Sequence, residues 1–153
     1  MSTRRRLLLA GAGMLSLSAL ALQPAPPIEI EVWKSPACGC CRDWVAHMEA
    51  NGFRVKVHDV GNTAARARLG LPEKVGSCHT ARVGRYAVEG HVPAQDVLRL
   101  LRERPQGLGL AVPRMPVGSP GMDGPAYGSR RDPFDVLLIA ADGSSSVFSS
   151  YFK

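Results

Sequence analysis

The sequence is poor in aromatic residues and lacks an apolar stretch long enough to cross a membrane. Aromatic side chains make up 6% of its 153 residues, and few of them lie among the scattered lysines and arginines. Proteins that bind nucleic acid combine a basic surface with aromatic rings that stack on bases, so nucleic acid is not an expected partner. The longest apolar stretch, residues 7–20, is shorter than the about 20 residues that a transmembrane helix needs. The sequence also has no internal repeats.

Residues 1–21 have the pattern of a removable export signal. Three arginines at positions 4–6 precede the apolar run, and Ala19-Leu20-Ala21 places small residues at the expected cleavage site. The segment resembles a twin-arginine signal, and an ordinary secretory signal fits it nearly as well, so both routes stay open. The alternative, an uncleaved membrane anchor, is disfavoured by the length of the run. No cysteine lies near the cleavage site, which excludes a lipoprotein signal.

The expected signal distorts the charge of the chain. It holds three of the 19 basic residues and none of the 13 acidic residues. Removal of the signal would therefore lower the formal net charge from +6 to +3. Residues 22–27 are expected to form a proline-rich linker. Residues 28–153 have the length of one ordinary domain, which can bury a core without relying on disulfides.

The remaining sequence predicts alternating strands and helices. Apolar and polar residues alternate over 28–33 and 53–57, as in half-buried strands, and a helical pattern runs from the cysteine cluster to Asn51. The other expected elements are a short helix over 62–69, strands over 81–86 and 87–91, a helix over 93–104, a Gly- and Pro-rich loop over 107–133, and a C-terminal hairpin over 136–140 and 147–152.

This order predicts an α/β fold: a single thioredoxin-like domain with a mixed sheet flanked by helices, a C-terminal Gly/Pro-rich loop and a hairpin. In that topology the loop before the third strand, residues 76–80, lies against the N-terminus of the first helix. Cys78 is therefore expected to face the other thiols. Thioredoxins usually carry a cis-proline in this loop and this chain does not, which disfavours an oxidoreductase.

All four cysteines belong to one expected cluster: Cys38, Cys40, Cys41 and Cys78. In an exported domain they predict two structural disulfides as the simplest interpretation. The adjacency of Cys40 and Cys41 argues against two structural disulfides. It also argues against a single tetrahedral zinc ion, because two neighbouring cysteines have difficulty directing both sulfurs at one ion. Cu(I) accepts two or three thiolates and allows sulfur to bridge neighbouring ions, with thioether and imidazole as further ligands. The spacing therefore favours a multinuclear Cu(I) site.

Further ligands are available outside the cysteines. Met115 and Met122 lie in a loop with too few large apolar residues to be ordinary core. His91 ends a predicted strand and can either cap a turn or reach a metal. His79 adjoins Cys78, but neighbouring side chains on an extended segment point in opposite directions, so only one of the pair is expected to meet the cluster.

Four separated segments together resemble the CopG-type copper-resistance family of bacterial periplasms, long catalogued as a domain of unknown function. They are residues 38–41, 77–81, 88–94 and 109–122, in the expected order. The resemblance implies a thioredoxin-like fold that holds a copper cluster bridged by cysteine sulfurs. Carried over by position, the implied ligands are Cys38, Cys40, Cys41 and Cys78, with His91, Met115 and Met122 as auxiliaries. The family pattern has a glycine where this chain has Arg114, just before Met115.

The resulting hypothesis is a periplasmic copper-binding protein of copper homeostasis or resistance that holds Cu(I) and can interconvert Cu(I) and Cu(II). Its expected partners are copper ions and other periplasmic copper-handling proteins, and no stable membrane span is expected once the signal is removed. The alternative is a thiol-disulfide oxidoreductase in which Cys38 attacks and Cys41 resolves the mixed disulfide. A module stabilised by disulfides is the third interpretation.

Overall fold

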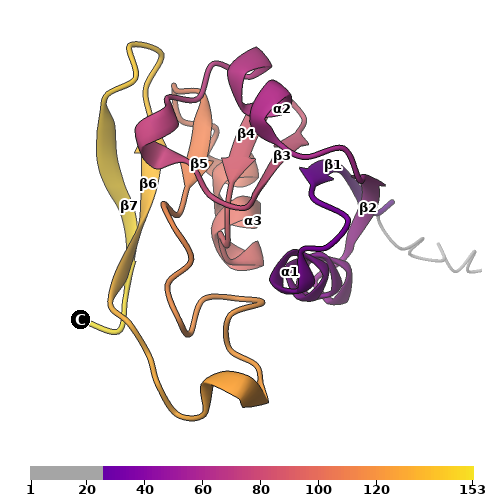
Figure 1. The fold of residues 1–153 in the computed structure, drawn as a ribbon. Coiled ribbons are helices and arrows are strands. Elements are labelled where there is room, and N and C mark those ends of the chain that lie inside the picture. Colours follow the sequence, from indigo (N-terminus) through magenta and orange to yellow (C-terminus); the bar gives the residue numbers. More distant parts are fainter. Residues whose placement is uncertain (1–25) are drawn as a thin grey trace, which may run out of the picture.

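The computed structural model describes residues 26–153. The expected export signal and most of the expected linker lie outside these residues. The described chain forms a mixed α/β domain around one seven-stranded sheet (Figure 1). Within it, no helix has both the length and the apolar character needed to cross a bilayer.

The sheet is open and mixed, with the strand order β2-β1-β3-β4-β5-β6-β7. Strands β1 and β2 are parallel, as are β4 and β5, and all other neighbouring pairs are antiparallel. The elements in chain order are β1 (Ile28–Lys34), α1 (Gly39–Ala50), β2 (Phe53–His58), α2 (Thr63–Arg68), η1 (Glu73–Val75), β3 (His79–Val83), β4 (Tyr86–Glu89), α3 (Ala94–Glu103), β5 (Gly109–Ala111), η2 (Pro125–Tyr127), β6 (Phe134–Ile139) and β7 (Ser145–Tyr151).

The predicted order of elements from β1 to α3 is confirmed, as is the C-terminal hairpin. Two details were wrong. The turn between β3 and β4 lies at Gly84 and Arg85, where Gly84 adopts a φ of 55°, so Tyr86 belongs to the second strand of the pair. A strand was also missed: β5 lies inside the segment expected to be a loop, and it joins the hairpin to the sheet by pairing with both β4 and β6. The thioredoxin-like classification stays a prediction.

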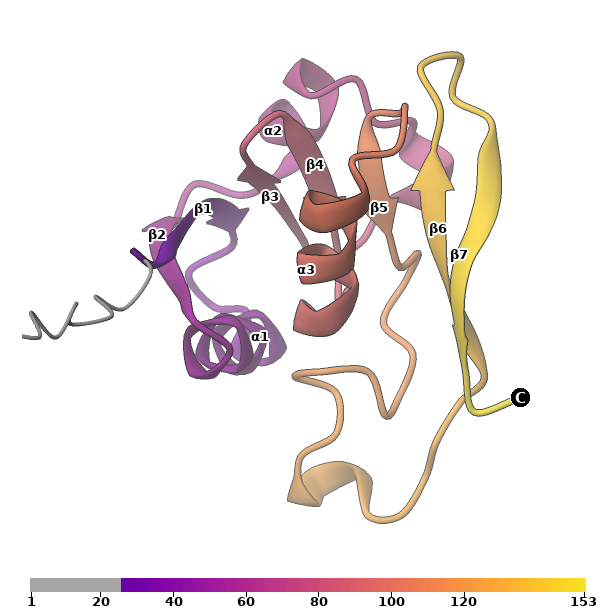
Figure 2. The same cartoon turned by 180° about the vertical axis from the view of Figure 1, so that it is seen from behind.

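Helices α1 and α3 lie on the same face of the sheet (Figure 2). They bury Trp44, Met48, Val97 and Leu100 against strand residues such as Val32 to form the main core. A smaller cluster, Leu71, Val75, Ala87, Ala111 and Ile139, involves η1. The sheet is thus covered by apolar side chains from several segments, and β1 and α1, which the cysteine motif joins, both pack into the main core.

The segment between β5 and β6 crosses the end of the molecule and reaches α1 (Figure 1). The approach is tight at Gly121, where a Cβ atom would lie 2.5 Å from the Cys40 carbonyl oxygen and 2.8 Å from the Trp44 nitrogen. Gly121 also has a φ of 84°. Only glycine fits this approach, so the loop that carries Met122 is fixed against the first turn of α1.

Candidate metal centre

The cysteine motif lies at the junction of β1 and α1. Cys38 is the N-cap residue of α1, and Cys40 and Cys41 belong to its first turn. Cys41 is buried, whereas Cys38 and Cys40 are half-buried. The motif is therefore a helix N-terminus, as the sequence predicted.

Antiparallel pairing of β1 with β3 brings the fourth cysteine to this motif. Lys34 at the end of β1 lies opposite His79 at the start of β3, and Cys78 directly precedes His79. The sulfur atoms of all four cysteines lie within 4.8 Å of one another. The expectation that Cys78 faces the other three thiols is confirmed.

The four sulfurs are in two chemical states. Cys38 and Cys41 form a disulfide with their Cα atoms 5.3 Å apart, while Cys40 and Cys78 are free. The Cys40 sulfur lies 3.5 Å from that of Cys38 and 4.0 Å from that of Cys78. A thiolate ligand cannot come from a sulfur in a disulfide, so the use of all four sulfurs requires reduction of the Cys38–Cys41 bond.

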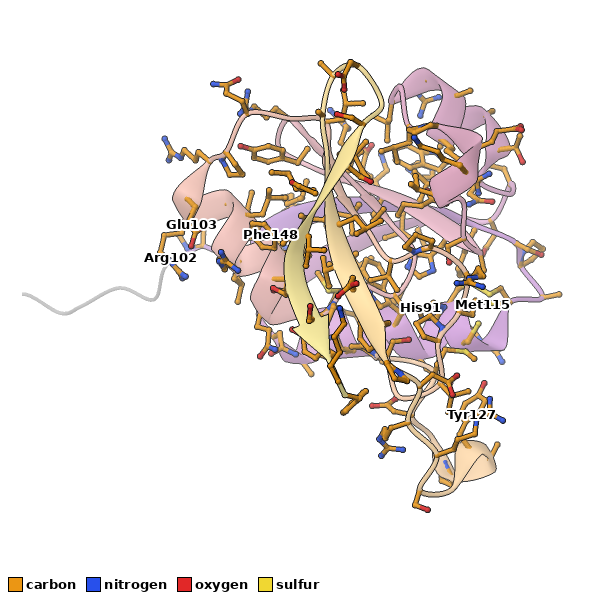
Figure 3. The ribbon with its side chains drawn as sticks, turned by 90° about the vertical axis from the view of Figure 1, so that its left-hand side faces the viewer. His91, Arg102, Glu103, Met115, Tyr127 and Phe148 are labelled. Carbon is orange, nitrogen blue, oxygen red and sulfur yellow. A yellow bond between two sulfur atoms is a disulfide. The ribbon has the colours of Figure 1, made fainter. Side chains whose placement is uncertain are left out.

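His91 is oriented as a metal-binding histidine would be. Its Nδ1 lies 2.8 Å from the carbonyl oxygen of Pro120, and its Nε2 lies 3.0 Å from the Cys78 sulfur. A carbonyl oxygen only accepts, so Nδ1 carries the proton and the lone pair of Nε2 faces the sulfur cluster. Burial lowers the pKa of His91, which keeps the ring neutral at physiological pH. Figure 3 shows His91 on the same side of the molecule as Met115, opposite the end of α3 marked by Glu103.

His79 also lies at the cluster. Its Nδ1 is 3.5 Å from the Cys78 sulfur, and Cys78, His79 and His91 place their ligand atoms within 4.8 Å of one another. Burial, reinforced by His91, lowers the pKa of His79 well below its ordinary value. Of this pair, only Cys78 lies in the group of four cysteines, as expected, and His79 contacts the site through Cys78 and His91.

The two methionines differ in their surroundings. Met122 is buried, and its sulfur accepts a hydrogen bond of 3.3 Å from the Tyr127 hydroxyl. Met115 is 47% exposed and lines a surface groove together with Arg114 and Asp135. The structure thus places Met122 in the loop against α1 and leaves Met115 at the surface. The role of all seven predicted ligands stays a prediction.

The environment of Cys78 makes it a weak acid. Burial, and after it the neighbouring Cys40, raises the pKa of the Cys78 thiol to about 12. At neutral pH this sulfur is protonated, so a metal that binds it displaces a proton. The opposite behaviour, a lowered pKa, is typical of attacking thiols in exchange reactions.

These features define a small α/β domain with a half-buried cluster of thiols and imidazoles, a donor set suited to a soft metal ion. Residues 75–122 match the family described as "Protein of unknown function, DUF411". Two solved structures, titled "Copper resistance protein copG- Form 2" and "Copper resistance protein copG- Form 1", are 47% and 48% identical to the chain. Each match covers 82% of this chain and 98% of the other, with a TM-score of 0.75. No curated protein sequence matches the chain.

The chain therefore belongs to the CopG-type copper-resistance family. The resemblance found in the sequence motifs is confirmed. Sequence reasoning left His79 open, although its position beside Cys78 was the available signal. It had no signal for the Pro120 carbonyl that orients His91, because that contact joins segments 29 residues apart.

Proposed function

We propose that this protein binds copper in the reduced state of its cysteine cluster and serves copper resistance or homeostasis. The observation that carries the proposal is the convergence of four cysteine sulfurs, with His79 and His91 beside Cys78. The copper-resistance titles of the related structures support copper as the metal. Copper is the cargo of this site, and no catalytic role is needed for it.

The donor set favours Cu(I) held in a multinuclear site. Six sulfur and nitrogen donors are more than one ion takes when it binds two or three thiolates, and sulfur can bridge neighbouring Cu(I) ions. Cys78 belongs both to the group of four cysteines and to the group with the two histidines, so it is the natural bridging ligand. The neutral ring of His91, whose unprotonated Nε2 faces the Cys78 sulfur, completes the coordination. Met115 and Met122 are proposed as thioether ligands that supplement this set.

The wider setting follows from the sequence. Residues 1–21 act as the export signal in this proposal, and the domain works in the periplasm, where other copper-handling proteins deliver or remove the metal. The β1-α1-β2-α2-β3-β4-α3 order supports a thioredoxin-like classification. The proposal includes passage between Cu(I) and Cu(II) at the cluster, with the one electron of each step given to or taken from an external redox partner.

A thiol-disulfide oxidoreductase is the second candidate, and the Cys38–Cys41 disulfide favours it. Such a protein would exchange this disulfide with a dithiol partner through a mixed disulfide. In that case Cys40, Cys78 and His91 would be dispensable, whereas copper binding requires them.

The deciding experiment compares copper retention by the wild type and by a variant with Ser at all four cysteine positions. Both proteins are reduced with dithiol under argon, freed of the dithiol by desalting, loaded with excess Cu(I), desalted again and analysed for metal and protein. More than one copper per chain in the wild type, lost in the variant, is the expected result. No retained copper together with one or two reducible disulfides would overturn the proposal in favour of the oxidoreductase.

A further inference from the structure

We propose that Glu89 and Arg66 are positioning residues for copper binding, which hold the Ser77–Cys78 segment so that the Cys78 sulfur meets the other ligands. This inference rests on the proposed copper function. Neither side chain touches a sulfur of the cluster; both act through the backbone of Ser77, the residue before Cys78.

The Ser77 backbone is held by side chains. Its N–H donates to Glu89 Oε1 at 2.7 Å, and its carbonyl accepts from Arg66 Nη2 at 2.8 Å and from Asn62 Nδ2 at 3.1 Å. The β1–β3 ladder ends at His79, so Cys78 and Ser77 lie beyond the last residue that strand pairing fixes. The Ser77 backbone has no strand partner on β1, and its hydrogen bonds come instead from three side chains, which belong to α2, its N-cap and β4.

Glu89 is the centre of this network. Its carboxylate is fully buried and also accepts from Arg66 Nε at 2.9 Å and from the Thr80 hydroxyl. A buried carboxylate is tolerated when its oxygens are paired and hydrogen-bonded, and removing one partner leaves an uncompensated charge. Glu89 and Arg66 thus form one rigid unit with Ser77, and loss of either partner frees the segment.

The opposite side of Ser77 has no spare room. A Cβ atom at Gly90 would lie 2.5 Å from Ser77 Oγ and 2.6 Å from the Val112 carbonyl oxygen. The Ser77 hydroxyl itself donates to the Arg114 carbonyl, in the loop before Met115. Ser77 is consequently fixed between β4 and the loop that carries Met115, which also fixes the backbone position of Cys78, the next residue.

The consequence is preorganisation of one ligand. The Cys78 sulfur lies 4.0 Å from that of Cys40 and 3.0 Å from His91 Nε2, distances that a small displacement of Ser77 would lengthen. Substitution of residues that orient metal ligands commonly weakens metal binding by about 10–100-fold. We expect a loss of Cu(I) affinity of that size for Glu89→Gln and Arg66→Met. The loss should be smaller for Arg66→Lys, which keeps the charge but has a single donor nitrogen where Arg66 uses two.

The test measures Cu(I) affinity of the reduced protein by competition with a chromophoric Cu(I) chelator. Asp96→Asn is the matched control: Asp96 is also a buried carboxylate, but it accepts from the hydroxyls of Ser149 and Tyr151 on β7 and touches nothing in residues 76–78. Melting temperatures and circular dichroism of each variant establish that the fold persists. We expect weakened Cu(I) binding for Glu89→Gln and Arg66→Met and wild-type binding for Asp96→Asn.

A second readout needs no metal. In a background with Ser at positions 38, 40 and 41, Cys78 is the only thiol, and its alkylation rate reports how well the segment is held. Glu89→Gln and Arg66→Met should raise that rate, and Asp96→Asn should not.

The outcomes separate the two proposals. If the wild type binds no Cu(I), the proposed function fails, whatever the alkylation rates are. If the wild type binds Cu(I) and folded Glu89→Gln and Arg66→Met variants bind it equally tightly, the positioning role is wrong. It is also wrong if Asp96→Asn weakens binding as much as they do, because a general loss of stability would then explain the effect.

Discussion

The raised pKa of Cys78 predicts that this thiol reacts far more slowly than an ordinary cysteine. Burial is the largest cause, and it persists when the other three cysteines are replaced by serine. At pH 8 a thiol with a pKa of about 9 is about one-tenth thiolate, whereas a pKa of about 12 leaves about one part in ten thousand. Since the thiolate is the nucleophile, alkylation of Cys78 in the intact cluster should be up to about 1,000-fold slower than for an exposed cysteine, and the slowing should be smaller in that variant, which lacks the contribution of Cys40.

The assay follows alkylation of the single thiol by iodoacetamide from pH 7 to pH 11, with the extent of modification read by mass spectrometry. The rate should keep rising with pH through the whole range, without levelling off near pH 9. The same variant unfolded in urea provides the control, and its rate should level off at the ordinary thiol pKa. A plateau at or below pH 9 in the folded protein would refute the reasoning, because it would mean that Cys78 ionises as a solvent-exposed thiol does.

Three further predictions concern other residues of the site. Gly90→Ala should lower the free energy of unfolding, measured in urea, by at least about 2 kcal/mol, because φ is 71° there and the new methyl group would overlap Ser77. An unchanged free energy of unfolding would contradict this close packing. Arg114→Gly should raise the free energy of unfolding by about 0.5 kcal/mol, because Arg114 has a φ of 64°, which glycine adopts without strain. Arg114→Ala should leave the free energy of unfolding no higher than in the wild type. Equal effects of the two substitutions would show that φ is not the cause. The ring of His79 should show no titration near pH 6.5 in NMR spectra of the metal-free protein, since burial lowers its pKa, and an inflection there would show that the ring is solvated.

Local patterns in the sequence predicted most of the fold. The alternation of Phe53, Val55 and Val57 with polar residues predicted β2, and the apolar spacing after the cysteines predicted α1. Strand β5 escaped prediction because Gly109-Leu110-Ala111 has neither length nor β-branched residues, and its strand conformation comes from pairing with β4 and β6. Contacts made by the final sheet outweigh local preference at such a segment.

The site divides in the same way. The cysteine spacing and the element order together predicted that Cys78 would meet the motif at the start of α1, and it does. The network of Glu89 and Arg66 was not predictable, because a charged pair in a sequence is usually exposed and these two residues are 23 positions apart. The hydrogen bond from His91 to Pro120 likewise exists only once the loop has folded back onto α1.

The need for Cys78 separates the two candidate functions, because copper binding requires this thiol and exchange by Cys38 and Cys41 does not. The Cys38–Cys41 disulfide favours exchange, but copper binding also accommodates it, since a metal-binding cluster can be oxidised when no metal holds its thiolates. Exchange would use Cys38 and Cys41, whereas Cys78 is protonated and faces Cys40 and His91, where a bound metal ion would reach it. A soft metal ion reverses the cost of ionising such a thiol, because it displaces the proton and binds the thiolate directly. The proton released should make Cu(I) affinity rise by about tenfold per pH unit for this ligand alone, so Cys78→Ser should flatten the pH dependence of binding by that amount.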